Sequence, residues 1–118
     1  MFVVASDDMQ WCEEEFNKIK NETFYYAWDF HHSLNGNIQE DVFDLALLSK
    51  CNHSIYDYGT FGFWAAYIAG GHTVLADHPG NGNNEEIRNI KSAKLKNWHF
   101  IPAQEYNIDT QHLYCSRI

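Results

Sequence analysis

Residues 59–71 read GTFGFWAAYIAGG, and this stretch decides the fold. A turn at Gly59–Gly62 comes shortly after Ser54–Tyr56, a short run that is typical of a buried strand. The apolar segment Phe63–Ala69 predicts a buried, aromatic-rich helix, and Gly70-Gly71 predicts the cap at its C-terminal end. A further apolar run at Thr73–Ala76 follows directly. A strand, a helix and a strand in this order predict parallel strands with a helical crossover.

The rest of the chain repeats this alternation. We expect strands at 2–5, 23–26, 54–56 and 73–76, and helices at 8–20, 38–50, 63–69 and 85–96. Asp7 and Gln10 fit a capping box for the first helix. A loop is predicted at 79–84, and the tail from Trp98 shows no strong period. The order predicts an α/β fold, a doubly wound parallel sheet flanked by helices, whose ligands bind beyond the carboxyl ends of the strands.

Composition limits the classes of partner. The chain has 118 residues, which suits a single domain, with 8 Lys and Arg against 16 Asp and Glu for a net charge of −8. This acidity argues against nucleic acid and against anionic membrane surfaces, because both attract clustered Lys and Arg. The longest weakly polar run, residues 59–71, is well short of the roughly 20 residues of a membrane span. We therefore expect no nucleic-acid partner, no signal or transmembrane segment, and no membrane contact from this chain itself.

Cysteines, histidines and sequons carry weaker signals. The three cysteines, Cys12, Cys51 and Cys115, form no CxxC pair, so neither a disulfide framework nor a zinc site is predicted, although one bridge with one free thiol stays open. None of the seven histidines has a partner at the i, i+4 spacing of a helical metal site. We therefore expect no metal. Asn21 and Asn52 begin Asn-x-Ser/Thr sequons that can be glycosylated only in a secretory compartment.

Gly59 and Thr60 form the sharpest candidate site. A glycine after a strand lets the backbone approach a ligand. The Thr60 hydroxyl and the first free N–H groups of the following helix can then hold a phosphate. The alternative is an N-cap threonine in a tight turn that holds nothing.

Four acidic residues form the second set of candidates. Asp44 stands among apolar residues of the predicted helix at 38–50 and can accept N–H donors from a base or a sugar. The alternative is a solvated acid near the helix start, and this interpretation suits Asp41 best. For Asp7 and Asp8, helix capping is the default interpretation.

Together these segments resemble a known family. Cys51–Ile55 and Gly59–Gly71 look like the C-terminal signature of the α-1,2-fucosyltransferases, the galactoside 2-α-L-fucosyltransferases. Val4–Cys12 and Asp44–Ser49 resemble the segments before that signature. Trp98 and Ile101 resemble the family's closing Trp-x-x-Ile. The likeness runs from about residue 2 to residue 101, and 102–118 form a tail.

The resemblance implies an activity. The chain would be a single domain over 1–118, the C-terminal, GDP-fucose-binding half of a two-domain glycosyltransferase with Rossmann-like halves. The whole enzyme would transfer L-fucose from GDP-fucose to the 2-hydroxyl of a terminal galactose on a glycan, with inversion. It would need no cofactor and no metal, and it would reside in the Golgi membrane.

The resemblance also implies residue roles, while it leaves the catalytic residue unassigned. The implied GDP-fucose-binding residues are Asp44 at the guanine edge, Gly59, Thr60 and Phe61 at the β-phosphate, and Asp7 and Asp8 near the nucleoside. An Asp carboxylate can accept from both guanine N1–H and N2–H, a pattern that adenine does not offer.

One motif of the family is missing. The sequence has no His-x-Arg-x-Gly-Asp, whose Arg would hold the diphosphate, and Arg88 and Arg117 lack that context. Two hypotheses follow from this departure. Either the chain is part of a longer fucosyltransferase, or it is a catalytically inactive GDP-binding remnant.

Overall fold

A computed structural model describes residues 1–34, 36–57, 59–77 and 85–102. Strands and helices alternate along these residues, except that two helices follow one another between the second and third strands. The strands are β1 (Phe2–Val4), β2 (Phe24–Tyr26), β3 (Ser54–Tyr56), β4 (Thr73–Asp77) and β5 (Trp98–Pro102). The helices are α1 (Met9–Phe16), α2 (Trp28–His31), α3 (Glu40–Leu48), α4 (Thr60–Ala69) and α5 (Glu85–Ala93).

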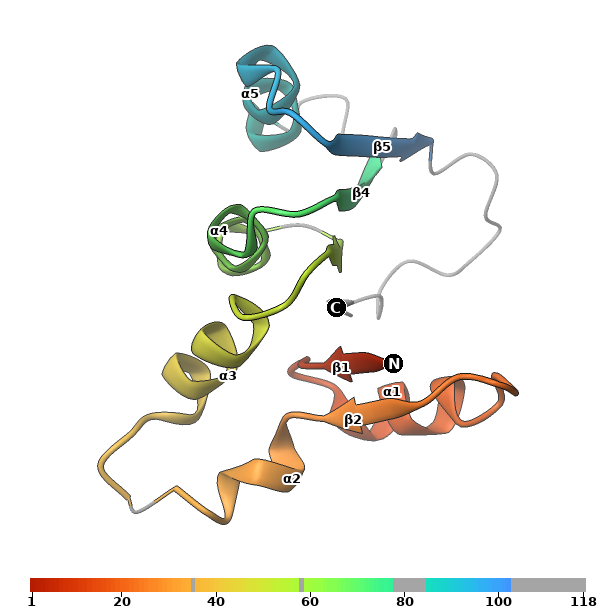
Figure 1. Ribbon diagram of the computed structural model, residues 1–118, viewed down its shortest axis with the longest axis vertical. Coiled ribbons are helices and arrows are strands. Elements are labelled where there is room, and N and C mark those ends of the chain that lie inside the picture. The colour runs from red at the N-terminus through yellow and green to blue at the C-terminus, as the bar shows by residue number, and fades with distance from the viewer. Residues whose placement is uncertain (35, 58, 78–84, 103–118) are drawn as a thin grey trace.

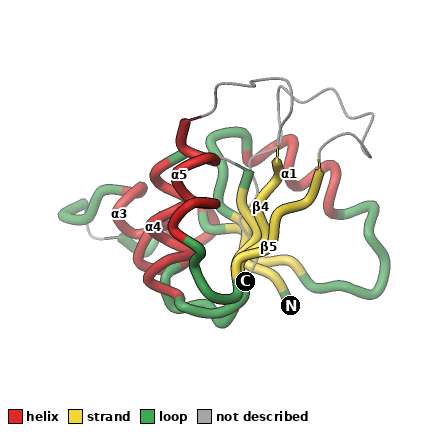
Figure 2. Tube along the Cα trace, turned by 90° about the horizontal axis from the view of Figure 1, so that it is seen from above, coloured by secondary structure: helices red, strands yellow, loops and turns green. Residues whose placement is uncertain are grey.

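All strand pairs of the described residues are parallel, as the sequence predicted, but they form two sheets. One sheet pairs β1 with β2, so that Phe2 lies opposite Phe24. The other has the order β3-β4-β5, and its register places Ser54 opposite Thr73 and Thr73 opposite Trp98. Figure 1 shows the strands in a column, from β2 and β1 through β3 to β4 and β5. Helices α3, α4 and α5 lie on one face of the strands and α1 on the other (Figure 2), which confirms the flanked, Rossmann-like α/β architecture.

Three groups of buried side chains hold these layers together. Val4, Met9, Cys12 and Tyr26 pack α1 against the first sheet. A larger cluster packs α4 and α5 against the second sheet. It consists of Tyr56, Ala66, Leu75, Ile87 and Ile90. A third cluster, Ala5, Ala27, Leu48 and Ala65, joins the ends of β1 and β2 to α3 and α4. Three of its four side chains are alanines, so these segments pack closely at this point.

The first half of the chain departs from the prediction in two places. Helix α1 is capped by Asp8, whose Oδ1 accepts from the backbone N–H of Trp11 at 3.2 Å, so the predicted capping box of Asp7 and Gln10 is wrong. The short helix α2 was not predicted. Its last residue, His31, contacts Asp44 of α3, and its four residues are too few to show a helical period in the sequence.

Helix α3 and the second half of the chain depart in three further places. The helical period predicted for 38–50 places Val42 and Leu48 on one apolar stripe, but Val42 is 53% exposed, whereas Leu48 is buried. Helix α4 begins at Thr60 rather than Phe63, and the predicted burial fails for Trp64, Tyr67 and Ile68, which are exposed. Strand β5 occupies part of the tail that showed no period. The predicted loop at 79–84 lies outside the described residues.

Candidate functional site

A cavity of about 670 Å³ opens beyond the carboxyl ends of β1 and β3. Its walls come from the segment after β1, from α2 and α3, and from the turn between β3 and α4. This is where a parallel α/β fold is expected to bind ligands. The volume suits a nucleotide-sized molecule, because ligand cavities are commonly on the order of 300–1,000 Å³.

Five of the six predicted donor residues line this cavity: Asp7, Asp44, Gly59, Thr60 and Phe61. The sixth, Asp8, is not among its described lining residues, and its carboxylate caps α1 as set out above. The fold therefore brings together the exposed Asp7, the partly buried Asp44 and the start of α4, which come from three separate parts of the chain.

The start of α4 has a geometry that would allow an anion to approach its backbone N–H groups. Gly59 is the N-cap residue, and its φ of 94° lies in the region that favours glycine. Thr60 is therefore the first helical residue, and the interpretation of Thr60 as the N-cap is wrong. The first hydrogen bond of the helix runs from the Phe63 N–H to the Gly59 carbonyl at 3.1 Å, and no side chain of the described residues makes a capping hydrogen bond at this helix start. The N–H groups before Phe63 thus remain available to a ligand at the positive end of the helix dipole.

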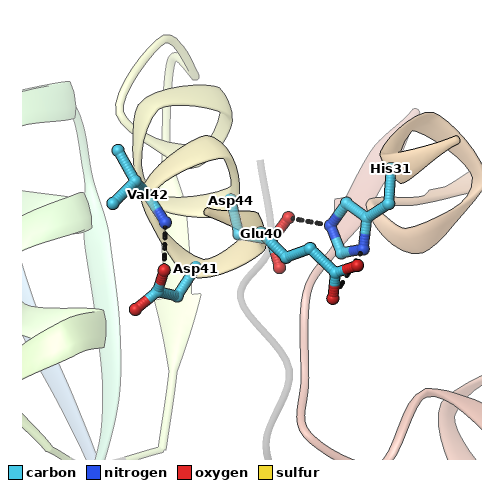
Figure 3. Close-up of polar contacts among 5 residues, drawn as sticks. All are labelled: His31, Glu40, Asp41, Val42 and Asp44. Atoms are coloured by element: carbon cyan, nitrogen blue, oxygen red, sulfur yellow. Dashed lines mark hydrogen bonds and ion pairs between the residues drawn. The ribbon is translucent and has the colours of Figure 1, made fainter. Parts of the chain in front are cut away.

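Asp44 is held by a histidine from α2 (Figure 3). His31 Nε2 lies 2.8 Å from Asp44 Oδ1, and His31 Nδ1 lies 3.4 Å from Glu40 Oε2. The side chains of His31 and Asp44 are only 14% and 15% exposed. Asp41 instead accepts from the backbone N–H of Val42 at 2.8 Å and is exposed, as its solvated interpretation predicted.

Sequence reasoning missed several residues that line the cavity: Trp28, His31, Glu40, Tyr56 and Asp57. Asp57 carried a usable signal, because it directly follows a predicted strand at its ligand-binding end. Tyr56 is buried, and burial, together with the negative charge of Glu86, raises the pKa of its phenol. The phenol therefore stays neutral at physiological pH. No local signal marked His31, since its contacts depend on an unpredicted helix.

The electrostatics of the cavity are unusual for an anion site. The described lining residues include five carboxylates, and His31 is the single basic side chain among them. An anionic ligand would therefore depend on backbone N–H groups and hydroxyls for its hydrogen bonds. In the described ranges, no group of three or more His, Cys, Asp or Glu side chains could hold a metal ion.

The profile of glycosyl transferase family 11 matches residues 1–102. The chain belongs to this family. Among curated members, galactoside α-(1,2)-fucosyltransferase 2 of Bos taurus is 38% identical over 109 residues, which are 87% of this chain and 28% of the bovine protein. Galactoside α-(1,2)-fucosyltransferase 1 of Leontopithecus chrysomelas is 46% identical over 105 residues, 87% of this chain and 27% of the relative. The resemblance drawn from the signature at 59–71 is thus confirmed.

This family 11 chain spans little more than a quarter of the length of those relatives. No solved structure matches it. Across the residues that the structure describes, no helix is both long and apolar enough to cross a membrane.

Proposed function

We propose that the cavity binds GDP-fucose and that the whole protein transfers L-fucose from it to the 2-hydroxyl of a terminal galactose on a glycan, with inversion. Residues 1–118 would form a single domain, the donor half of that enzyme. The observation that carries the proposal is the gathering of Asp44, Thr60 and the start of α4 in one cavity. The names of the relatives support the acceptor and the linkage.

Each group has a role that its position supports. The Asp44 carboxylate would accept from guanine N1–H and N2–H. The Thr60 hydroxyl and the free N–H groups of α4, with Gly59 and Phe61, would hold the β-phosphate. Negative charge grows on this phosphate as the bond to fucose breaks, so donors aimed there stabilise the transition state more than the ground state. Asp7 would lie near the nucleoside, while Asp8 would support the same loop from its capping position.

GDP-fucose is a substrate in this proposal, and the reaction would use no cofactor and no metal. On the family resemblance, the enzyme would act in the Golgi membrane. Asn21 and Asn52 are exposed, and we propose both as N-glycosylation sites. Loss of mass on treatment with an N-glycosidase, abolished by Asn21→Gln and Asn52→Gln together, would test this part.

A second candidate function is an inactive GDP-binding remnant. It is favoured by the missing His-x-Arg-x-Gly-Asp motif and by a described cavity lining that carries no Arg or Lys. Losing one donor to the leaving phosphate typically costs two to three orders of magnitude in rate, roughly 2.7–4 kcal/mol. One measurement separates the two candidates, an assay of fucose transfer to a galactoside by the full-length protein. The transferase proposal expects transfer, and the remnant expects none.

Two substitutions test the donor site itself. Thr60→Val should weaken GDP binding about tenfold and leave guanosine binding unchanged, because only GDP carries the phosphates. Asp44→Asn should reduce the preference for GDP over ADP. The controls are Ser92→Ala, which also removes a hydroxyl, and Asp29→Asn; both change exposed residues that do not line the described cavity. Equal losses of GDP and guanosine in Thr60→Val would remove the phosphate assignment.

A further inference from the structure

His31 reaches α3 from a different helix and is enclosed there on three sides. Its Nε2 faces Asp44, its Nδ1 faces Glu40, and its ring meets the edge of Phe43 with centroids 6.0 Å apart. Figure 3 shows the two carboxylates of α3 reaching one ring nitrogen each. A ring held in this way has little freedom to rotate.

The two carboxylate contacts differ in strength. Asp44 and His31 are both largely removed from water and lie 2.8 Å apart, so their hydrogen bond is well formed. Glu40 is 72% exposed and lies 3.4 Å away, so water competes for it. The contact that matters for His31 is therefore the one with Asp44.

This contact fixes the carboxylate of Asp44. An aspartate rotates easily about its last torsion, which is broad in proteins. When Oδ1 is bonded to His31, the plane of the carboxylate is set, and the remaining acceptor positions keep one direction. A base that offers two adjacent N–H groups needs such a fixed plane, because both bonds form only when both oxygens are oriented.

We propose that His31 is a positioning residue for Asp44 and thereby determines the preference of the donor cavity for guanine over other purines. The inference rests on the proposed donor function, since it assigns a task to Asp44 at that site. His31 acts through Asp44 and needs no contact with the nucleotide.

The test measures the dissociation constants of GDP, IDP and ADP by calorimetry on the full-length protein. IDP lacks the 2-amino group of guanine, so it reports the second hydrogen bond to Asp44. His31→Phe keeps a ring against Phe43 but donates nothing, and the preference for GDP over IDP and ADP should fall about tenfold. His31→Gln should restore most of the preference, because its amide N–H can donate in place of Nε2.

His32→Phe is the matched control. His32 is exposed and lies outside the cavity, so the preference should stay at the wild-type value. Thermal melts of each variant show whether the fold is kept. A merely structural role for His31 would weaken all three nucleotides equally in His31→Phe, and this result would overturn the inference.

The outcomes separate the inference from the proposed function. A wild-type protein that prefers GDP, with the same preference in His31→Phe, refutes the positioning role alone. If His31→Gln behaves like His31→Phe, the donated hydrogen bond is not the cause and the inference fails. A wild-type protein that binds none of the three nucleotides refutes the donor function and the inference together.

Discussion

Replacing Gly62 by alanine should destabilise the protein through one contact. Gly62 lies in the first turn of α4, against the ring of Tyr56. A Cβ at position 62 would stand 2.5 Å from Tyr56 Cδ2 and 2.8 Å from Tyr56 Cγ. Tyr56 is only 3% exposed and belongs to the core between β3, α4 and α5, so its ring has no free space to enter.

The magnitude follows from two opposing terms. Carbon atoms pack at about 3.5–4.0 Å, so the ring or the helix must move by roughly 1 Å. Overpacking of this kind costs about 1–3 kcal/mol, and the enclosed ring of Tyr56 places this site in the upper part of that range, about 2–3 kcal/mol. The higher helix propensity of alanine stabilises the folded state by about 1 kcal/mol relative to glycine. The net loss of about 1–2 kcal/mol should lower Tm by roughly 4–10 °C.

Urea denaturation of a double-mutant cycle tests this reasoning. In a Tyr56→Ala background the two closest ring atoms are gone and only the contact with Cβ of residue 56 at 3.0 Å stays, so Gly62→Ala should cost much less than in the wild-type protein. The reasoning is refuted if Gly62→Ala costs the same free energy of unfolding in both backgrounds. It is also refuted if the single substitution leaves the wild-type protein as stable or more stable.

Two further predictions concern the signature and its flank. Gly71→Ala should prevent stable folding, seen as loss of the cooperative thermal transition, because its Cβ would overlap the backbone carbonyl of Asn52. The Cys51 thiol donates to the Leu47 carbonyl at 3.1 Å, and burial raises the pKa of Cys51 from 9.0 to about 11. Between pH 9 and 11 the unfolded chain therefore loses this proton while the folded chain keeps it, so stability should fall as the pH rises. Cys51→Ser, which keeps a donor but does not ionise there, should show a smaller fall in urea midpoint across that window, and an equal fall would contradict the assignment.

Part of the fold was predictable from local signals. The signature at 59–71 predicted a helix that ends at Gly70, and Gly70 is indeed its left-handed cap with φ of 75°. Strands β3 and β4 follow from short apolar runs bounded by turn residues. These features depend on neighbours within a few residues, and such neighbours are visible in a sequence.

Strand β5 and helix α2 were missed because their stability comes from elsewhere. Strand β5 exists through its pairing with β4, from Thr73 with Trp98 to Asp77 with Pro102. Helix α2 has four residues and no side-chain cap, and isolated helices of that length do not form in water. Contacts with distant segments decide both, so neither leaves a period in the sequence.

The sequence by itself determined the alternation of strands and helices, the parallel pairing, and the end of the fold at which a cavity opens. It predicted Asp41 as a solvated acid and left Asp44 open between a solvated acid and a ligand-binding residue. Only the tertiary structure showed what surrounds Asp44, since it places that carboxylate against His31, thirteen positions away in the chain. The physical reason is that helix periodicity is a local property, whereas a hydrogen bond between two helices exists only where packing brings them together.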